Sequence, residues 1–249
     1  MYIRGAVTSG PVRKKSKNIR QVAARAVRDV MMKNIETKQS NQTIADGTEI
    51  FHNNFVTLSS NLLATTQGTW DPQTTSTNNR IGDQVTAIGV KIAMMVELNE
   101  RYSDVTFRLM IVKCARQDVP TRSTLFHGQS GNKMIDTVNT ERYSIIAQKW
   151  FKVKSPGQGT TSAVGLSGVA TMNDANVQLS RATRIVKLWI PGSKFAKSKI
   201  IKYEDTDSRT KFFDYHALSY AYSNYSTQQD IWYVARVNDF ICQFKYKDA

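Results

Sequence analysis

The stretch Arg80–Leu98 reads RIGDQVTAIGVKIAMMVEL, and every second residue in it is apolar from Ile88 onward. The apolar set is Ile88, Val90, Ile92, Met94, Val96 and Leu98. A period of two held over eleven residues is typical of a β-strand with one face in a core, and it does not fit a helix. The pair Gly82-Asp83 predicts a turn at the start of this strand.

The same alternation recurs in the rest of the chain. The further strands that it predicts are Glu49–Leu58, Val105–Ala115, Arg142–Lys154, Arg184–Ile190, a strand through Leu218, Tyr220 and Tyr222, Ile231–Val237 and Phe240–Tyr246. Only the short turn Asn99–Asp104 separates the strand that ends at Leu98 from the strand Val105–Ala115. We therefore expect these two long strands to form an antiparallel pair. Whether Asn238-Asp239 is a turn, or lies within one continuous strand, stays open.

These strands are joined by loops of very unequal length, among them Gln117–Thr140 and Ser155–Thr183. Short connections alternating with long ones favour a jelly roll over an up-and-down barrel. The predicted fold is therefore all-β: a single eight-stranded antiparallel jelly-roll sandwich over residues 43–249. A basic N-terminal arm, residues 1–42, precedes it.

Charge is concentrated in this arm. The 249 residues carry a net charge of +14, and residues 1–42 contribute +8 of it, from ten cations and two anions. A pI near 9.8 points to a polyanionic partner, with nucleic acid first and an acidic membrane surface second. No apolar run is long enough for a membrane-spanning helix, and no hydrophobic block follows the basic N-terminus, so we expect no membrane partner.

The arm divides into two parts. Residues 1–15 contain Gly5, Gly10 and Pro11 without apolar periodicity, which predicts disorder. Over residues 16–38 the apolar positions recur at helical spacing, which predicts a short amphipathic helix. The apolar stripe consists of Ile19, Val22, Ala26 and Val30. This apolar stripe must pack against a partner, which could be the β domain, a membrane or another copy of the helix.

The cations of the arm are the expected contacts to nucleic-acid phosphates. They are Arg13, Lys14, Lys15, Lys17, Arg20, Arg25, Arg28 and Lys33. No aromatic residue lies between Tyr2 and Phe51, so this binding should be electrostatic and independent of sequence. The run Arg13-Lys14-Lys15-Ser16-Lys17 also fits a nuclear-import signal.

Further candidate residues lie in the β domain. Four lysines in one basic segment could face either a packaged genome or solvent: Lys194, Lys197, Lys199 and Lys202. The carboxylates of Glu204, Asp205 and Asp207 are the weak candidates for calcium, with simple solvation as the alternative. The two cysteines, Cys114 and Cys242, are expected to be buried thiols. No metal-binding, P-loop or nucleophile-elbow motif is present, so we expect no catalysis and no other cofactor.

The order of these features resembles the single-jelly-roll capsid proteins of small icosahedral viruses. The similarity is to the satellite tobacco necrosis virus type and to the circular Rep-encoding single-stranded DNA viruses. It covers most of residues 13–249. It is carried by the basic helix, Arg80-Ile81-Gly82-Asp83-Gln84-Val85, the strands at Val105–Val112 and Arg142–Val153, and the ending Tyr246-Lys247-Asp248-Ala249. The chain lacks the long arginine run of the circovirus type, and its segment between Ser155 and Thr183 is longer than in the satellite-virus type.

The resemblance implies a coat protein that assembles into a shell of sixty copies, a T=1 capsid, with the arms pointing inward onto a single-stranded genome. It also implies helices that associate in threes, which would cover the apolar stripe. The expected location is the virion, and the host nucleus during assembly if the genome is DNA. The host receptor stays unknown.

Three other functions remain open. One is a lectin-like or cytokine-like jelly-roll trimer, a binding module with a nucleic-acid-binding tail. Another is a non-viral nucleic-acid-binding barrel. The third, an enzyme, lacks a recognisable constellation of catalytic residues.

Overall fold

The structure is a computed structural model of the whole chain. It describes residues 19–24, 26–27, 30, 35–44, 47–68, 79–99, 102, 104–128, 132–155, 182–204, 207–223 and 232–248. The chain divides into two compact units, residues 1–37 and residues 38–249. Residues 35–37 are not helical and Lys38 begins a strand, so the helix expected to reach residue 38 does not. The domain boundary expected between residues 42 and 43 falls inside that strand.

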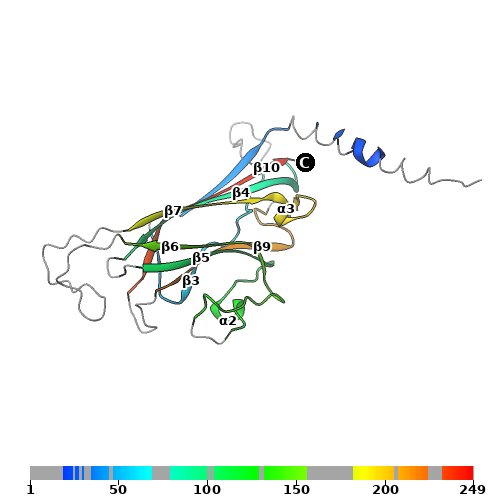
Figure 1. Cartoon of the computed structure of the whole chain (residues 1–249). Coiled ribbons are helices and arrows are strands. Elements are labelled where there is room, and N and C mark those ends of the chain that lie inside the picture. Colours follow the sequence, from blue (N-terminus) through cyan, green and yellow to red (C-terminus); the bar gives the residue numbers. More distant parts are fainter. Residues whose placement is uncertain are drawn as a thin grey trace, which may run out of the picture. The chain divides into compact units, whose positions relative to one another are not determined.

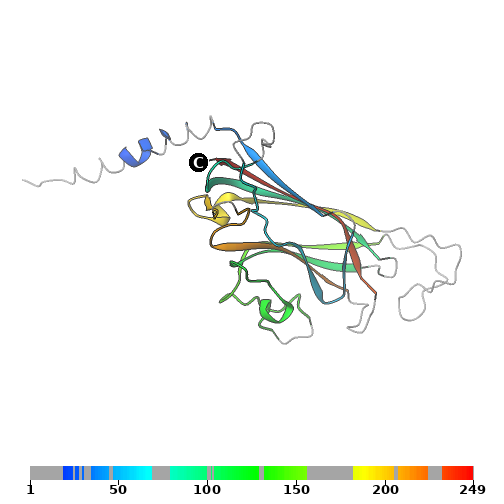
Figure 2. The same ribbon diagram turned by 180° about the vertical axis from the view of Figure 1, so that it is seen from behind.

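The second unit consists of two antiparallel sheets packed face to face (Figure 1 and Figure 2). The predicted all-β class is confirmed. The strands are β1 Lys38–Ile44, β2 Thr48–Ile50, β3 Asn54–Ser59, β4 Gln84–Leu98, β5 Asp104–Ala115, β6 Ser144–Lys154, β7 Thr183–Pro191, β8 Ile200–Lys202, β9 Phe213–Tyr222 and β10 Ala235–Asp248. Two single-turn helices, α2 Arg122–Leu125 and α3 Gly192–Phe195, lie in the connections.

Sheet A has the strand order β1-β10-β4-β7, and sheet B has the order β3-β9-β5-β6. Two short strands extend sheet A: β2 pairs with β10 beyond the end of β1, and β8 pairs with β4 beyond the end of β7. Every pairing between these strands is antiparallel. The longest strands, β4 and β10, lie side by side in the middle of sheet A.

The core fills the space between the inner faces of the sheets. It is formed mainly by alternate residues of the central strands, as the period of two predicted. These include Val90, Ile92, Met94, Val96 and Leu98 of β4, Val105, Phe107, Leu109 and Ile111 of β5, and Phe240, Cys242, Phe244 and Tyr246 of β10. Burial of such side chains contributes roughly 1.5–3 kcal/mol each.

Ile88 was predicted to share this inner face, and that prediction is wrong. The register with β10 passes from Gly89 to Ala87 and omits Ile88, so a β-bulge lies at this residue. Before the bulge, Val85 and Ala87 are the buried residues, whereas Ile88 is only half-buried. One extra residue in the strand has reversed the phase of the alternation.

A second β-bulge, at Asn238, settles whether Asn238-Asp239 is a turn or lies within one strand. β10 runs continuously through it, and the register with β4 omits this residue between Val237 and Asp239. The buried positions change from Ala235 and Val237 to Phe240 and the even-numbered residues that follow. Asn238 is therefore a bulge within one strand, not a turn.

The expected hairpin between β4 and β5 does not form. Both hydrogen-bonding edges of β4 are taken by β10 and by β7 with β8, and both edges of β5 are taken by β9 and β6. The connection crosses from one sheet to the other, and Tyr102 within it is buried in the main core. The single strand expected at Glu49–Leu58 likewise divides into β2 in sheet A and β3 in sheet B, with Asn53 between them at a φ of +52°.

The connection from β5 to β6, expected to be a polar loop, covers the outer face of sheet B with a second apolar cluster. Its apolar residues pack against outward-facing residues of β5 and β9. The cluster comprises Met110, Val112, Cys114, Leu125, Phe126, Val138, Tyr143 and Leu218. Both cysteines are buried free thiols, as predicted, and burial raises the pKa of each to about 12.

Candidate nucleic-acid interface

The helical part of the N-terminal unit exposes its apolar stripe. The described residues between Ile19 and Val30 are helical, and Ile19, Val22 and Val30 are 69%, 65% and 60% exposed. Ala26 is exposed as well. At about 100° per residue these positions share one side of the helix. Among the described residues of this unit nothing covers the stripe, which leaves it available for a partner.

Of the eight cations predicted to contact phosphates, the structure describes one. Arg20 lies on the helix and is exposed. The other seven fall outside the described residues: Arg13, Lys14, Lys15, Lys17, Arg25, Arg28 and Lys33. Their contact with nucleic acid stays a prediction.

Lys38, the first residue of the β unit, is fixed where three parts of the sequence meet. Its Nζ lies 2.6 Å from the carboxylate of Asp248 and donates to the carbonyl of Asn79 at 2.9 Å. The amide of Ile81 donates to the same carboxylate at 3.3 Å. The Arg80–Val85 motif, the C-terminal segment and the start of β1 are therefore neighbours, although they lie far apart in sequence.

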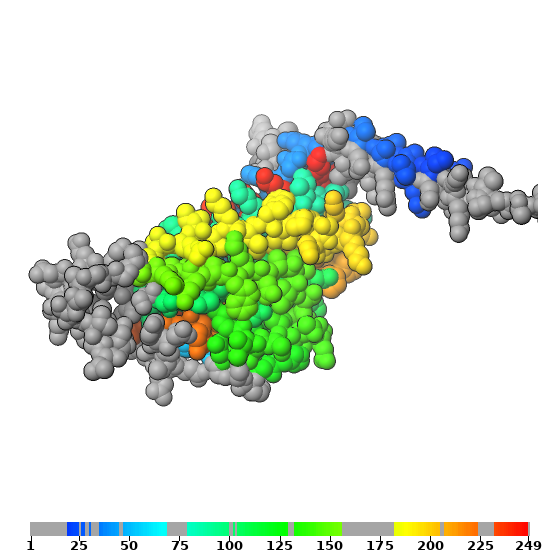
Figure 3. All heavy atoms as spheres, viewed as in Figure 1, coloured from blue at the N-terminus to red at the C-terminus, as the bar shows by residue number. Residues whose placement is uncertain are grey.

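The four candidate lysines belong to the segment that connects β7 to β9, and all four are exposed: Lys194, Lys197, Lys199 and Lys202. Lys199 adopts a φ of +61°, and its carbonyl accepts a 2.7 Å hydrogen bond from the amide of Ala87. β8 then pairs with the start of β4, from Gln84 to Thr86. The segment is thus held against sheet A, and its atoms, yellow in Figure 3, form part of the surface on which the four lysines are exposed.

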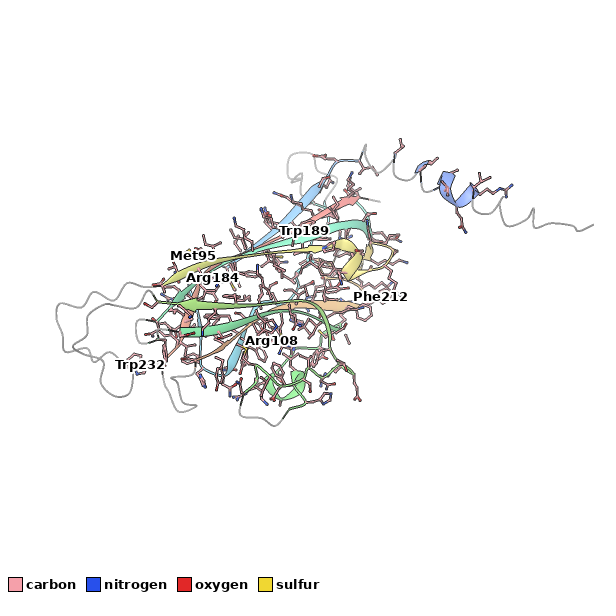
Figure 4. All side chains as sticks on the ribbon, viewed as in Figure 1. Met95, Arg108, Arg184, Trp189, Phe212 and Trp232 are labelled. Atoms are coloured by element: carbon pink, nitrogen blue, oxygen red, sulfur yellow. The ribbon has the colours of Figure 1, made fainter. Side chains whose placement is uncertain are left out.

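A groove of about 600 Å³ lies between this segment and the residues that lead into β9. It lies at the end of the sandwich where α3 and Phe212 are found (Figure 4). We call it the α3–β9 groove. Its lining residues are Lys113, Ser193, Lys194, Phe195, Ala196, Lys197, Ser198, Ile200, Ile201, Lys202, Thr210, Phe212, Phe213 and Tyr215.

The lining of the α3–β9 groove combines positive charge with aromatic surface. Four lysines line it, and no Asp or Glu is among the lining residues. Phe212 and Phe213 are 57% and 41% exposed. The Nζ of Lys113 lies 3.6 Å from the centroid of the Phe213 ring, a cation–π contact. Such a surface favours anions that also carry flat apolar groups.

The floor of the groove is apolar and uncharged. Phe195, Ile201 and Tyr215 are buried there, and the two aromatic rings pack edge to face at 5.3 Å. Burial raises the pKa of Tyr215 to about 12, so its hydroxyl stays protonated at neutral pH and adds no negative charge. The positive charge of the lysines therefore meets no ionised group in the floor.

Sequence reasoning singled out Lys194, Lys197 and Lys202 but missed the rest of the groove. Lys113 lies in β5, and Phe212 precedes β9, so only the folded chain brings them beside α3. The available signal was the run Lys211-Phe212-Phe213, in which a cation adjoins two aromatic residues before a strand. Lys199 and Lys211 are exposed nearby but do not line the groove.

The arm joins the β unit at the same end as this groove. Lys38 pairs with Tyr246, which pairs with Ala87, and β8 pairs with β4 at the adjacent Thr86. Across sheet A, β1 and β8 are thus three strand spacings apart at this level, or about 14 Å.

The candidate calcium ligands are already paired with a cation. The guanidinium of Arg116 contacts the carboxylate of Glu204 and lies 2.8 Å from that of Asp207. The hydrogen bond to Glu204 is the main cause that raises the pKa of Arg116. Asp205 lies outside the described residues, and no group of three or more potential metal ligands occurs in the described part of the chain.

Comparison with known proteins identifies no family. No protein-family model matches the chain, and no curated protein sequence matches it. Within the residues that the structure describes, no helix is long and apolar enough to cross a membrane.

Proposed function

We propose that this protein is a viral coat protein that assembles into a small icosahedral shell and packages a single-stranded genome through its basic arm. The observation that carries this proposal is the attachment of a +8 arm, with an uncovered apolar stripe, to a β-sandwich. A lectin-like or cytokine-like binding module does not need such an arm, whereas a shell needs both genome neutralisation and contacts between copies.

The strand order supports a jelly roll of eight strand positions. β1 with β2 forms one position beside β10, and β7 with β8 forms another beside β4. Numbered along the chain, the eight positions pair as 1 with 8, 2 with 7, 3 with 6 and 4 with 5. A long antiparallel hairpin wrapped into two sheets produces these pairs, and this double Greek key is common in viral capsid and lectin domains.

The arm has the charge that a packaging role requires. Sixty arms at +8 each would carry about +480, enough for several hundred phosphates. A longer genome would need further cations, and the four lysines in the α3–β9 groove lie at the end of the sandwich where β1 begins. The groove is the proposed second contact between protein and genome.

The outer face of sheet A offers a surface for contacts between copies. Ile185, Trp189 and Ile241 are 63%, 50% and 39% exposed, and Met95 pairs with Ile185 on the same face. Trp189 lies over Gly89, where an added Cβ would come within 2.5 Å of the indole ring. We call these four residues the sheet A patch. Exposed apolar residues gathered on one face are typical of protein–protein contacts.

The proposal is tested by microscopy and sedimentation of the full-length protein beside a chain that starts at Thr37. This start preserves the whole of β1 and the ion pair between Lys38 and Asp248. We expect the full-length protein to form uniform shells about 20 nm wide, given subunit radii near 17 Å. We expect these shells to protect nucleic acid from nuclease, and the shortened chain to lose that protection.

A variant with serine at Ile19 and Val22 separates the two roles of the arm. It keeps every cation, so it should still bind nucleic acid, but it removes half of the apolar stripe and should weaken assembly. A full-length protein that stays a monomer or trimer at every salt concentration, with no protected nucleic acid, would overturn the coat-protein proposal. That result would favour the jelly-roll binding module instead.

A further inference from the structure

The exposed phenyl rings of the α3–β9 groove have no role in a purely electrostatic contact. Lysines alone would neutralise phosphates, and Phe212 is 57% exposed in a groove whose floor already contains buried aromatic residues. Phe213 differs from Phe212, because Lys113 lies 3.6 Å above its ring and occupies one face. The Nζ of Lys211 is farther from the Phe212 ring, at 5.9 Å from its centroid.

We infer that the α3–β9 groove binds an unpaired segment of nucleic acid, with a base stacked on Phe212 and the flanking phosphates on Lys113, Lys194 and Lys197. This deepens the proposed function and rests on it for the identity of the polyanion. Every base has a flat π-face, so an exposed ring within a basic groove holds single strands without sequence preference.

The dimensions of the groove favour a single strand over a duplex. Its volume of about 600 Å³ falls within the range of roughly 300–1,000 Å³ that small-ligand sites occupy. In a duplex each base is covered above and below by its neighbours, so a protein ring can stack only on a base that has left the helix. The groove therefore selects unpaired nucleotides.

The two phenylalanines have different roles in this inference: Phe213 positions Lys113, and Phe212 stacks on a base. The ammonium of Lys113 is held above the Phe213 ring, where it can contact a phosphate without losing the cation–π contact. Lys194 and Lys197 are exposed lining residues from the other side of the groove, the segment that connects β7 to β9. A strand lying between these two sides places its phosphates toward the lysines and leaves a base free to reach Phe212.

The test compares two ligands of equal charge on the full-length protein, at a salt concentration that keeps it as free subunits. One is an oligothymidine of about twelve nucleotides, and the other is an abasic strand of the same length. Fluorescence anisotropy gives both affinities. Replacement of Phe212 by leucine should weaken oligothymidine binding roughly tenfold and leave abasic binding unchanged.

Two further variants separate stacking from charge. Phe51→Leu makes the same chemical change at a 39% exposed phenylalanine next to Ile50, which pairs with Ala235 at the opposite end of sheet A, and it should leave both affinities unchanged. Replacing Lys194 and Lys197 by glutamine should weaken the binding of both ligands alike. It should also reduce the slope of log affinity against log salt concentration by about 0.7 per lysine. Ultraviolet cross-linking of bound oligothymidine should place the contact at Phe212 or Phe213.

The inference is overturned if Phe212→Leu weakens both ligands equally, or if cross-links occur only before Lys38. Heparin that binds as tightly as oligothymidine, and competes with it independently of Phe212, would show a general polyanion surface instead. These results leave the coat-protein proposal intact, since that proposal fails only if no shells form. Conversely, base-dependent binding by a protein that never assembles would support the groove and overturn the coat protein.

Discussion

The guanidinium carbon of Arg80 lies 4.8 Å from the ring centroid of Tyr203, and the Arg80 side chain is completely buried. Its terminal nitrogens donate to the carbonyls of Gly82, Glu204 and Asp207, at 2.6, 3.1 and 2.8 Å. This arginine opens the RIGDQV motif and joins two loops that lie more than a hundred residues apart in sequence. Its role is therefore structural, and the motif marks a junction rather than a nucleic-acid contact.

Replacing Arg80 by alanine should destabilise the protein by about 3 kcal/mol, because three backbone carbonyls lose their charged donor and the fully buried side chain leaves a space. Lysine at this position should recover part of the loss, since it keeps the charge but not the planar fork. Urea unfolding measures the free energy of unfolding of both variants. Arg209→Ala, an exposed change in the adjoining loop, is the control and should stay within about 0.5 kcal/mol. Equal effects of the two alanine variants would contradict this role.

The sequence predicted β4 and most of the buried positions of β4 and β10, because alternation is a local property, but it left open whether β10 is one strand or two. It could not locate the bulges, since Ile88 is as apolar as its neighbours and only the register with β10 shows that it is an extra residue. It could not assign β4 and β5 to different sheets either. A short connection fits a hairpin as well as a corner, and the partner strands that decide between them lie more than thirty residues away in the sequence.

The candidate interface was predictable to a similar extent. Runs of basic residues are visible in any sequence, so the sequence predicted the basic arm and the lysines between β7 and β9 as candidate contacts. The aromatic half of the groove was not predicted, because only the folded chain brings Phe212 and Phe213 beside the lysines that follow β7. Lys113 interrupts an apolar strand, and only its position above the Phe213 ring connects it with the groove.

The stability of the β unit should fall below about pH 6.5 because of His216. Its Nε2 lies 3.1 Å from the carbonyl of Asp118, and burial lowers the pKa of the ring below its ordinary value of 6.5. The unfolded chain then takes up a proton that the native state does not, so stability is present above pH 6.5 and is lost as the pH falls toward the native pKa.

Urea midpoints measured between about pH 8 and pH 2.5 test this behaviour. His216→Gln should flatten the decline, whereas glutamine at the exposed His127 should leave the profile unchanged. A second decline should begin below about pH 4, because hydrogen bonds from Arg142 lower the pKa of Asp118. If the profile of His216→Gln matched that of the wild type, the first decline would have another origin.

Removal of divalent cations should leave the melting temperature unchanged. Arg116 already supplies a positive charge between the carboxylates of Glu204 and Asp207, which a calcium ion would have to displace. Thermal melts with EDTA and with added calcium measure this directly. Arg116→Gln is the informative variant: it frees both carboxylates and should make the melting temperature rise with calcium. Sensitivity of the wild-type protein to EDTA would instead point to a site that includes Asp205.

Assembly of the proposed shell should depend on the sheet A patch. Ile185 is 63% exposed beside Met95, so glutamate at this position should leave the subunit folded while adding a charge to the patch. A buried, unpaired carboxylate at a contact between copies costs several kcal/mol, enough to prevent closure of a shell built from many identical contacts. Sedimentation should therefore show free subunits with an unchanged circular dichroism spectrum. Ile135→Glu, at a residue 73% exposed between β5 and β6, carries the same charge outside the patch and should assemble normally. If Ile185→Glu formed shells as readily as Ile135→Glu, the copies would meet through a different face of the sandwich.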